Sequence, residues 1–257
     1  MDIKRKAYLE ACQVSRKFED GAAFVAALQD VSFQIMQGEF VCIIGRSGCG
    51  KSTLLRILAG LDHDYAGTVR VSGEIVTRPS RRIGVVFQEP RLFPWLTVRQ
   101  NVAFALADIP SETREKIVRD HLDMVGLLSF AEAMPRQLSG GMAQRVSIAR
   151  ALVNRPEVML MDEPFGALDY ITKQGMQEEL LRIKEQEGMT IIFVTHDIDE
   201  AVYLSDRIII MDSHPGRIKA EVQCSIAKPR DRNGEDFMQL RGKVFAYFQD
   251  MQADYGE

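Results

Sequence analysis

A single glycine-rich segment constrains the fold of this chain more than any other feature. The residues GRSGCGKST at 45–53 match the pattern G-x-x-x-x-G-K-[ST], follow the apolar run FVCII and precede the helical run TLLRILAGL. Glycines at such positions let backbone amides turn toward a phosphate group, and the start of the following helix adds a favourable dipole. The sequence therefore predicts a buried strand, a phosphate-binding loop and a helix in immediate succession.

The polar residues of this loop indicate which phosphate compound it binds. Lys51 is expected to neutralise charge on β- and γ-phosphates, and the Ser52 hydroxyl is expected to ligate Mg²⁺. The predicted nucleotide contacts in the loop are Gly45, Ser47, Gly48, Cys49, Gly50, Lys51, Ser52 and Thr53. This pattern favours a nucleoside triphosphate bound together with Mg²⁺.

The rest of the chain alternates apolar runs of strand length with helical patterns, which predicts an α/β fold with helical crossovers. The predicted strands are 8–15, 27–35, 40–45, 68–73, 82–87, 157–162, 190–195 and 207–212. Between residues 97 and 154 only helical patterns occur, at 97–106, 111–127 and 140–153, so a helical insertion in the α/β core is expected. The second of these helices is expected to begin with a loose capping box at Ser111. From about residue 214 a short extended stretch, a charged turn and one amphipathic helix follow.

Composition disfavours several classes of protein. The net charge of −4, from 32 basic and 36 acidic residues, gives no bulk reason to expect nucleic acid as the main partner. The longest apolar runs, 190–194 and 207–211, are far shorter than the roughly 20 residues that span a bilayer. The N-terminus lacks the apolar region of a secretory signal. We therefore expect a cytosolic chain that does not cross a membrane by itself.

The four cysteines show no CxxC pair and no histidine at metal-ligand spacing, so they are predicted to be reduced thiols. Cys12 and Cys42 are expected to fill the core. Cys49 lies near Lys51 and a helix start, where the pKa of a thiol tends to fall. Two interpretations follow for Cys49: a thiol sensitive to oxidation, or, as we favour, a small residue that fits a tight loop.

A pair of carboxylates follows a second buried strand, in VMLMDEP at 158–164. Two adjacent carboxylates at the carboxyl end of a strand are costly without a cation, which makes Mg²⁺–ATP the natural ligand. Asp162 is predicted to hold Mg²⁺, and Glu163 is placed to polarise a water molecule against the γ-phosphate.

The segment QLSGGMAQRVSIARAL at 137–152 distinguishes between the enzyme classes that share these two motifs. Ser139 is predicted to be the N-cap of a helix, and Gly140 and Gly141 would expose backbone amides to an anion. Kinases and GTPases built on a phosphate-binding loop need no second anion-binding helix start so far from the first. The segment therefore argues against both.

With these three segments, the chain resembles the ATP-binding subunits of ABC transporters over essentially its whole length. The Walker A motif matches 45–53, the Walker B motif 158–163 and the signature motif 138–142. By the same resemblance Gln88 lies at the Q-loop, ALD at 167–169 is the D-loop, and His196 is the switch histidine. Phe18 occupies the place of the aromatic residue that stacks on adenine, with the nearby Phe24 as an alternative.

The resemblance implies a P-loop NTPase core with an antiparallel β subdomain and an inserted helical subdomain. We expect residues 1–88 and 155–225 to form the ATP-binding core, 89–154 the helical subdomain that carries the signature motif, and 226–257 a helical tail.

The resemblance also implies a head-to-tail homodimer in which ATP lies between the loop at 45–53 of one subunit and the signature motif of the other. Ser139 and Gly141 would then contact the γ-phosphate, where many P-loop enzymes use an arginine finger. The catalytic residues that the resemblance implies are Lys51, Gln88, Glu163 and His196. The implied nucleotide contacts outside the first loop are Phe18, Gln88, Ser139, Gly140, Gly141 and Asp169. The implied Mg²⁺ ligands are Ser52, Gln88 and Asp162.

Three segments resemble the importer branch that handles nitrate, sulfonates, taurine and related solutes: QEPRLFPWLTVRQNV at 88–102, DEPFGALD at 162–169 and MDSHPGRI at 211–218. This implies a peripheral ATPase at the cytoplasmic face of the cell membrane. The ATPase would power separate integral-membrane permease subunits, and an extracytoplasmic solute-binding protein would deliver the solute to them. A separate-subunit exporter and a non-transport ABC ATPase are the alternatives. Neither a coiled-coil insertion nor a second ATPase half is present, which disfavours DNA-repair and translation relatives.

The only tryptophan, Trp95, lies between Pro94 and Leu96 shortly after Gln88. It is either a buried core residue or, as we favour, a partly exposed apolar anchor for the permease, because tryptophan is enriched at interface hot spots.

Overall fold

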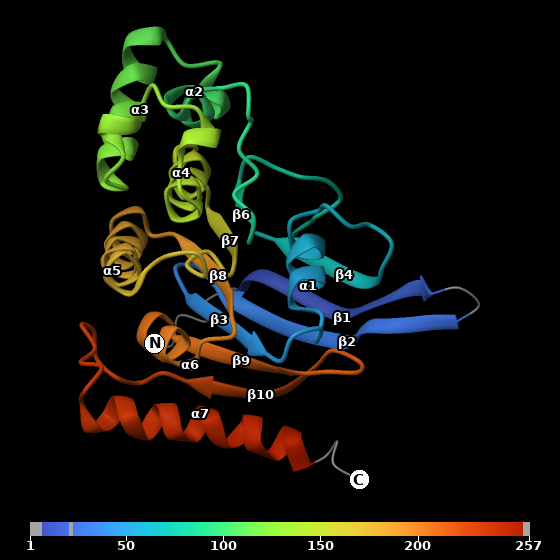
Figure 1. Cartoon of the computed structure of the whole chain (residues 1–257). Coiled ribbons are helices and arrows are strands. Elements are labelled where there is room, and N and C mark those ends of the chain that lie inside the picture. The colour runs from blue at the N-terminus through green and yellow to red at the C-terminus, as the bar shows by residue number, and fades with distance from the viewer. Residues whose placement is uncertain (1–6, 21–22, 254–257) are drawn as a thin grey trace, which may run out of the picture. The chain divides into compact units, whose positions relative to one another are not determined.

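The computed structural model describes residues 7–20 and 23–253, which divide into two compact units (Figure 1). One unit comprises the described residues of 1–80 and 190–257, and the other comprises 81–189. This division follows backbone packing and is a different partition from the functional boundaries expected above, which stay a prediction.

The first unit contains an antiparallel sheet of four strands in the order β2-β1-β4-β5. Its strands are β1 (Ala7–Asp20), β2 (Ala23–Met36), β4 (Ala66–Val71) and the short β5 (Glu74–Ile75). Leu9 of β1 pairs with Ile35 of β2, and both are fully buried. The predicted antiparallel β subdomain is confirmed.

Alternation along β1 corrects one expectation about the cysteines. Leu9 and Ala11 are buried, so the next residue, Cys12, points to the opposite face and is exposed. The prediction that Cys12 fills the core is therefore wrong, whereas Cys42 is buried as predicted.

The first unit also contains parallel strands that carry the predicted phosphate loop. Strand β3 (Phe40–Gly45) lies between β8 (Thr190–Thr195) and β9 (Arg207–Asp212) and is parallel to both, and β10 (Arg217–Gln223) pairs antiparallel with β9. Every residue of β3 and β8 is buried, as expected for parallel strands covered on both faces. This unit also holds α1 (Lys51–Leu58), α6 (Ile198–Leu204) and α7 (Glu235–Ala253).

The tail forms the amphipathic helix that its sequence predicted. Phe237 and Val244 of α7 lie seven residues apart and are buried, whereas Met238 and Phe245 are half exposed. Arg241 of α7 pairs with Asp199 of α6 at 2.6 Å. The tail helix is therefore packed onto the first unit through one apolar stripe and one ion pair.

The second unit pairs two strands and carries the helices of the insertion. Strands β6 (Ile83–Val86) and β7 (Val158–Asp162) are parallel, with Val86 beside Met161. The helices are α2 (Val98–Ala103), α3 (Ser111–Met124), α4 (Gly140–Leu152) and α5 (Tyr170–Glu187), with 3₁₀ turns at Phe104–Leu106, Leu128–Phe130 and Pro135–Gln137. No strand occurs between 97 and 154, as predicted.

One helix start differs from its prediction. Ser111 is the first helical residue of α3, and Pro110 before it, the N-cap, offers no side-chain hydrogen bond. A capping box instead opens α2, where Thr97 Oγ1 accepts from the amide of Gln100 and Gln100 Oε1 accepts from the amide of Thr97. The box expected at Ser111 is wrong because that residue lies inside the helix rather than at its cap.

In the described ranges, 7–20 and 23–253, we find no helix with both the length and the apolar content to cross a bilayer.

Candidate functional site

The predicted phosphate loop connects β3 to α1 and depends on glycine at specific points. A Cβ atom at Gly45 would lie 2.6 Å from the carbonyl oxygen of Met211 and 2.7 Å from Cys49 Sγ, so no larger residue fits there. Gly48 and Gly50 have φ values of 79° and 89°, in the left-handed region that favours glycine. The loop therefore has the tight, glycine-dependent backbone that its sequence predicted.

Lys51 is held over this loop by the loop itself. Its side chain is 7% exposed, and Nζ donates to the carbonyl oxygens of Gly45 at 2.8 Å and Arg46 at 2.9 Å. Helix α1 has no side-chain N-cap, so its first amides have no side-chain acceptor. An ammonium group and a helix start thus form a site suited to a polyanion.

Cys49 is buried in the same loop, and burial raises the pKa of its thiol. Lys51 Nζ lies 3.6 Å from Cys49 Sγ and acts in the opposite direction, but desolvation outweighs it. The expected fall in the pKa of Cys49 is therefore wrong. The favoured interpretation, a small residue in a tight loop, agrees with the position of Cys49 Sγ, which lies 2.7 Å from where a Cβ atom of residue 45 would be.

Two predicted catalytic residues meet in the second unit. Glu163 follows β7 and Gln88 follows β6, and these parallel strands end at the same edge. Gln88 Nε2 donates to Glu163 Oε2 at 3.3 Å. Glu163 has a φ of 45°, a conformation that costs energy for a residue other than glycine.

The predicted metal ligand of this unit, Asp162, is 9% exposed at the end of β7. The predicted Mg²⁺ donors are the Ser52 hydroxyl, the Gln88 amide oxygen and the Asp162 carboxylate, all oxygen atoms of the kind that Mg²⁺ prefers. Among the residues that the structure describes, no group of three or more His, Cys, Asp or Glu side chains could hold a metal ion. Each of these oxygen atoms is of a type that would suit Mg²⁺, which completes its shell with phosphate oxygens and water.

The predicted signature segment forms an exposed helix start. Ser139 is the N-cap of α4, and its Oγ accepts from the amide of Met142 at 3.2 Å, as predicted. A Cβ atom at Gly140 would meet nothing within 4 Å, whereas one at Gly141 would lie 3.1 Å from Leu168 Cδ2. The structure thus places Gly141 beside the predicted D-loop at 167–169.

Asp169, at the end of that segment, has a structural function that its sequence did not reveal. It is the N-cap of α5, and its Oδ1 accepts from the amide of Thr172 at 3.1 Å. Its hydrogen bonding to Thr172 lowers the pKa of Asp169. Asp169 is exposed, so a contact with another molecule is compatible with this cap.

The two candidate adenine-stacking residues and the candidate switch histidine are all exposed. Phe18 of β1 is 41% exposed and Phe24 of β2 is 69% exposed. The guanidinium of Arg16 lies 4.3 Å from the Phe18 ring, so one face of that ring already has a cationic neighbour. His196 is exposed directly after β8.

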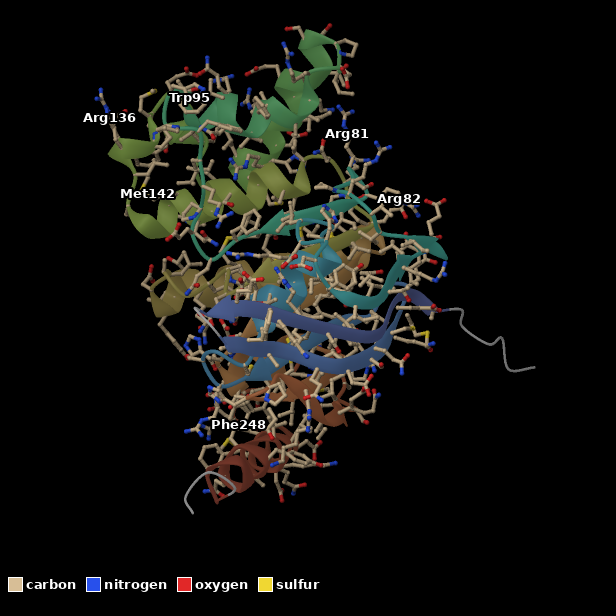
Figure 2. All side chains as sticks on the ribbon, turned by 90° about the vertical axis from the view of Figure 1, so that its right-hand side faces the viewer. Arg81, Arg82, Trp95, Arg136, Met142 and Phe248 are labelled. Atoms are coloured by element: carbon tan, nitrogen blue, oxygen red, sulfur yellow. The ribbon has the colours of Figure 1, made fainter. Side chains whose placement is uncertain are left out.

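Trp95 is 70% exposed, so the buried-core interpretation is wrong (Figure 2). The Phe93 ring lies 5.6 Å from the Trp95 ring and 4.5 Å from that of Phe104, which is also exposed.

The sequence did not reveal that Asn101 holds this loop in place. Asn101 is buried, and its side-chain oxygen accepts from the amide of Phe93. Its side-chain nitrogen donates to the carbonyl oxygens of Phe93, Leu96 and Thr97. A polar residue in the middle of a short helix is the only sequence signal that pointed to it.

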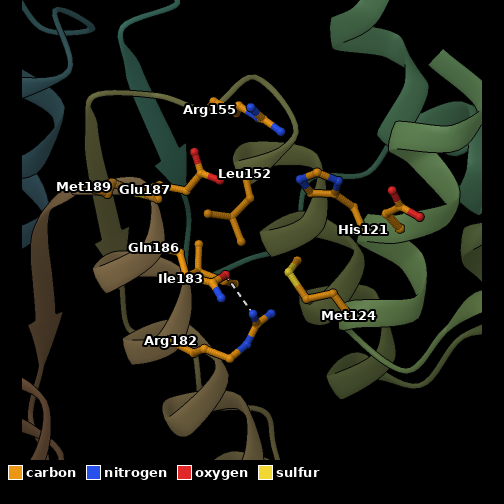
Figure 3. Close-up of a pocket in the computed structure, with 10 residues that line it drawn as sticks. His121, Met124, Leu152, Arg155, Arg182, Ile183, Gln186, Glu187 and Met189 are labelled. Atoms are coloured by element: carbon orange, nitrogen blue, oxygen red, sulfur yellow. Dashed lines mark hydrogen bonds between the residues drawn. The ribbon is translucent and has the colours of Figure 1, made fainter. Parts of the chain in front are cut away.

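A cavity of about 180 Å³ lies among α3, α4 and α5 of the second unit (Figure 3). Its lining includes Arg155 and Arg182 but also Asp120 and Glu187, so its charges balance and favour no particular ligand. Arg182 is moreover paired with Glu179. None of the predicted site residues lines this cavity.

Several known proteins are similar to this chain. A family model described as ABC transporter matches residues 28–166. The aliphatic sulfonates import ATP-binding protein SsuB of Bacillus cereus is 48% identical over 237 residues, which cover 92% of this chain and 94% of that protein. An uncharacterized ABC transporter ATP-binding protein of Methanocaldococcus jannaschii is 46% identical over 96% of this chain and 93% of its own length.

A solved structure is similar as well. An ATP-binding cassette, solved as a dimer in a post-hydrolysis state bound to ADP and Pi, matches with a TM-score of 0.79 and 35% identity. The match covers 85% of this chain and 100% of that one.

Proposed function

The chain belongs to the ABC transporter family and is an ATP-hydrolysing subunit, and we propose that it energises an importer of aliphatic sulfonates or a closely related small solute. Support for the solute class comes from the sulfonate import protein, which is similar over nearly the whole length of both chains. Nitrate and taurine, which the sequence also suggested, belong to the same group of small oxyanions and sulfonates.

The observation that carries the catalytic part of this proposal is the hydrogen bond between Gln88 Nε2 and Glu163 Oε2. It orients the carboxylate that would accept a proton from the attacking water. Lys51 would hold the β- and γ-phosphates, and His196 would contact the γ-phosphate. Mg²⁺, when bound through Ser52, Gln88 and Asp162, would neutralise charge on the phosphates.

We propose that two copies of the chain assemble head to tail around ATP. At the signature helix start, Ser139 and Gly140 are exposed and Gly141 is half-buried, and the helix start would offer backbone amides to an anion. The phosphate loop at 45–53 belongs to the first unit and this helix start to the second. A related cassette forms a dimer, which supports the proposal.

The proposed partners in transport are integral-membrane permease subunits, with an extracytoplasmic solute-binding protein acting indirectly. The chain would then act at the cytoplasmic face of the membrane as a peripheral subunit. The aromatic cluster of the exposed Trp95 and Phe104 with the half-buried Phe93 is the surface we assign to the permease, because apolar rings on a fixed loop suit an interface hot spot.

Two experiments test these proposals at different levels. Glu163→Gln should retain ATP affinity, stop turnover and trap an ATP-bound dimer that size-exclusion chromatography detects. Hydrolysis by this variant near the wild-type rate would remove Glu163 from the role of general base.

A growth experiment tests the solute. Loss of the gene should abolish growth of the host on an aliphatic sulfonate as sole sulfur source but not on sulfate. Unchanged growth on the sulfonate would favour another solute or the exporter alternative.

A further inference from the structure

Helix α4 carries a buried glutamine that none of the predicted roles explains. Gln144 is 1% exposed, and its Nε2 donates to the carbonyl oxygen of Phe87 at 3.0 Å. Its Oε1 has no hydrogen-bond partner among the described residues. Burying an amide that is only half satisfied is unfavourable, so its one contact calls for an explanation.

The hydrogen bond from Gln144 fixes the backbone just before Gln88. A second residue of α4 fixes the backbone just after it. Phe87 immediately precedes Gln88. Arg150, six residues after Gln144, donates to the carbonyl oxygens of Pro90 at 3.1 Å and Arg91 at 2.9 Å. Helix α4 is therefore attached to the chain both before and after Gln88.

The two ends of this connection are functional segments. Helix α4 begins at Ser139, within the signature segment, and Gln144 lies in its second turn. Gln88, between the two attachment points, donates to Glu163. A displacement of the helix start would thus reach the carboxylate through one helix, one backbone carbonyl and one side-chain hydrogen bond, all inside the second unit.

We propose that Gln144 is a positioning residue that couples the two ATP sites of the dimer. The inference rests on the proposed head-to-tail dimer, in which Ser139 of a subunit contacts one ATP while Gln88 and Glu163 of the same subunit act on the other. When α4 engages the γ-phosphate at one site, Gln144 sets the position of Gln88 at the second site. Closure around one nucleotide then favours hydrolysis of the other.

The test replaces Gln144 with methionine, which has a similar volume and helix preference but no amide donor. We expect ATP binding by the dilute monomer to stay within about twofold. Hydrolysis at saturating ATP should fall about fivefold or more, and the Hill coefficient should fall from a value approaching 2 to about 1. A Hill coefficient and kcat equal to those of the wild type would overturn the inference.

Arg145→Met is the matched control on the same helix. Arg145 donates one hydrogen bond to the carbonyl oxygen of Val125 at 2.9 Å, a contact that does not involve the chain around Gln88. Its substitution should loosen the packing of α4 yet leave the Hill coefficient unchanged. An equal loss of cooperativity in Arg145→Met would mean general loosening of the helix and would contradict a specific role for Gln144.

Two further variants keep the inference testable if Gln144→Met does not fold. Arg150→Gln shortens the half-buried side chain that holds Pro90 and Arg91, and it should also lower the Hill coefficient; a wild-type value would contradict the coupling route. In a Gln88→Ala background, Arg150→Gln should cause no further loss of cooperativity, because both act through Gln88. Additive losses would exclude that route.

The Hill coefficient of the wild type distinguishes failure of this inference from failure of the proposed function. Cooperative hydrolysis by the wild type together with cooperative hydrolysis by Gln144→Met would reject only the inference. Hydrolysis by the wild type with a Hill coefficient of 1 would reject the composite sites, and the inference with them.

Discussion

The two glycine-rich segments predicted to contact phosphate, 45–53 and 138–142, are built in different ways. In the first, Lys51 is buried and donates to two carbonyl oxygens of the loop, and Gly50 adopts a left-handed conformation. In the second, Ser139 caps its own helix, both Ser139 and Gly140 are exposed, and neither glycine has a positive φ.

This difference indicates which part of the nucleotide site a single subunit completes. The first segment has its own cation and a backbone fixed by its glycines, so we expect it to bind a phosphate chain without a second subunit. The second segment offers a helix start but no cation of its own. We therefore expect changes in the first segment to impair ATP binding by the monomer, and changes in the second to impair only hydrolysis by the dimer.

The largest expected effect comes from Lys51→Met. Removal of the only buried ammonium group of the loop should weaken ATP binding by the monomer and reduce hydrolysis by about 100-fold or more. Equilibrium binding with a fluorescent ATP analogue and a steady-state ATPase assay measure both. Normal binding by this variant would contradict the idea that the first segment binds phosphate by itself.

Gly141→Asp should reduce hydrolysis comparably without changing binding by the monomer. The new carboxylate would lie beside Leu168 and would repel the γ-phosphate of the ATP that the other subunit binds. Ser139→Ala should have the same effect in weaker form, because one hydroxyl donor is lost. Hydrolysis at the wild-type rate by dilute Gly141→Asp would show that the second segment does not complete a composite site.

The backbone difference predicts a contrast in stability between two glycine-to-alanine variants. Gly50→Ala places Cβ 2.6 Å from the carbonyl oxygen of Ala27 at a φ of 89°, so the free energy of unfolding should fall by about 2 kcal/mol or more. Gly140→Ala meets no atom within 4 Å and should change that energy by about 0.5 kcal/mol or less. Urea denaturation measures both, and equal losses would erase the contrast.

The reactivity of two cysteines toward an alkylating reagent tests whether the first segment excludes solvent. Burial raises the pKa of Cys49, whereas Cys12 is exposed, so iodoacetamide at pH 8 should modify Cys12 first. Because the folded-state pKa of Cys49 is raised, the stability linked to its neutral thiol is complete below the unfolded value of about 8.5. That stability is lost as the pH rises toward the folded value.

Thermal melts at pH 7.5 and 9.5 therefore provide the measurement. Wild type should lose stability between these pH values, and Cys49→Ala should lose less. Modification of Cys49 at the rate of Cys12 would show that the loop is open.

The smallest effect on the isolated protein is expected at a surface outside both segments. Trp95→Ala should change ATP hydrolysis by the isolated chain by about twofold or less, because Trp95 is exposed. It should nevertheless reduce co-purification with the permease by about tenfold or more. Unchanged assembly would move the permease surface elsewhere, and loss of folding would show that the ring stabilises the fold.

Several features of the fold were predictable because they depend on short-range patterns. The eight predicted strands all appear within a few residues of their expected positions, because short runs rich in β-branched and aromatic residues, such as 190–195, favour a buried strand. The glycines of 45–53 and the N-cap Ser139 were predictable for the same reason: local backbone geometry decides which residues are allowed.

The sequence by itself thus determined the phosphate loop, the order of strands and helices along the chain, and the family resemblance. Tertiary structure decided the outward position of Cys12, the burial and raised pKa of Cys49, the exposure of Trp95, and the contacts from Gln144 to Phe87 and from Gln88 to Glu163. The physical reason is that solvent exposure, desolvation and these hydrogen bonds depend on residues far apart in the chain, such as 87 and 144, which only packing brings together.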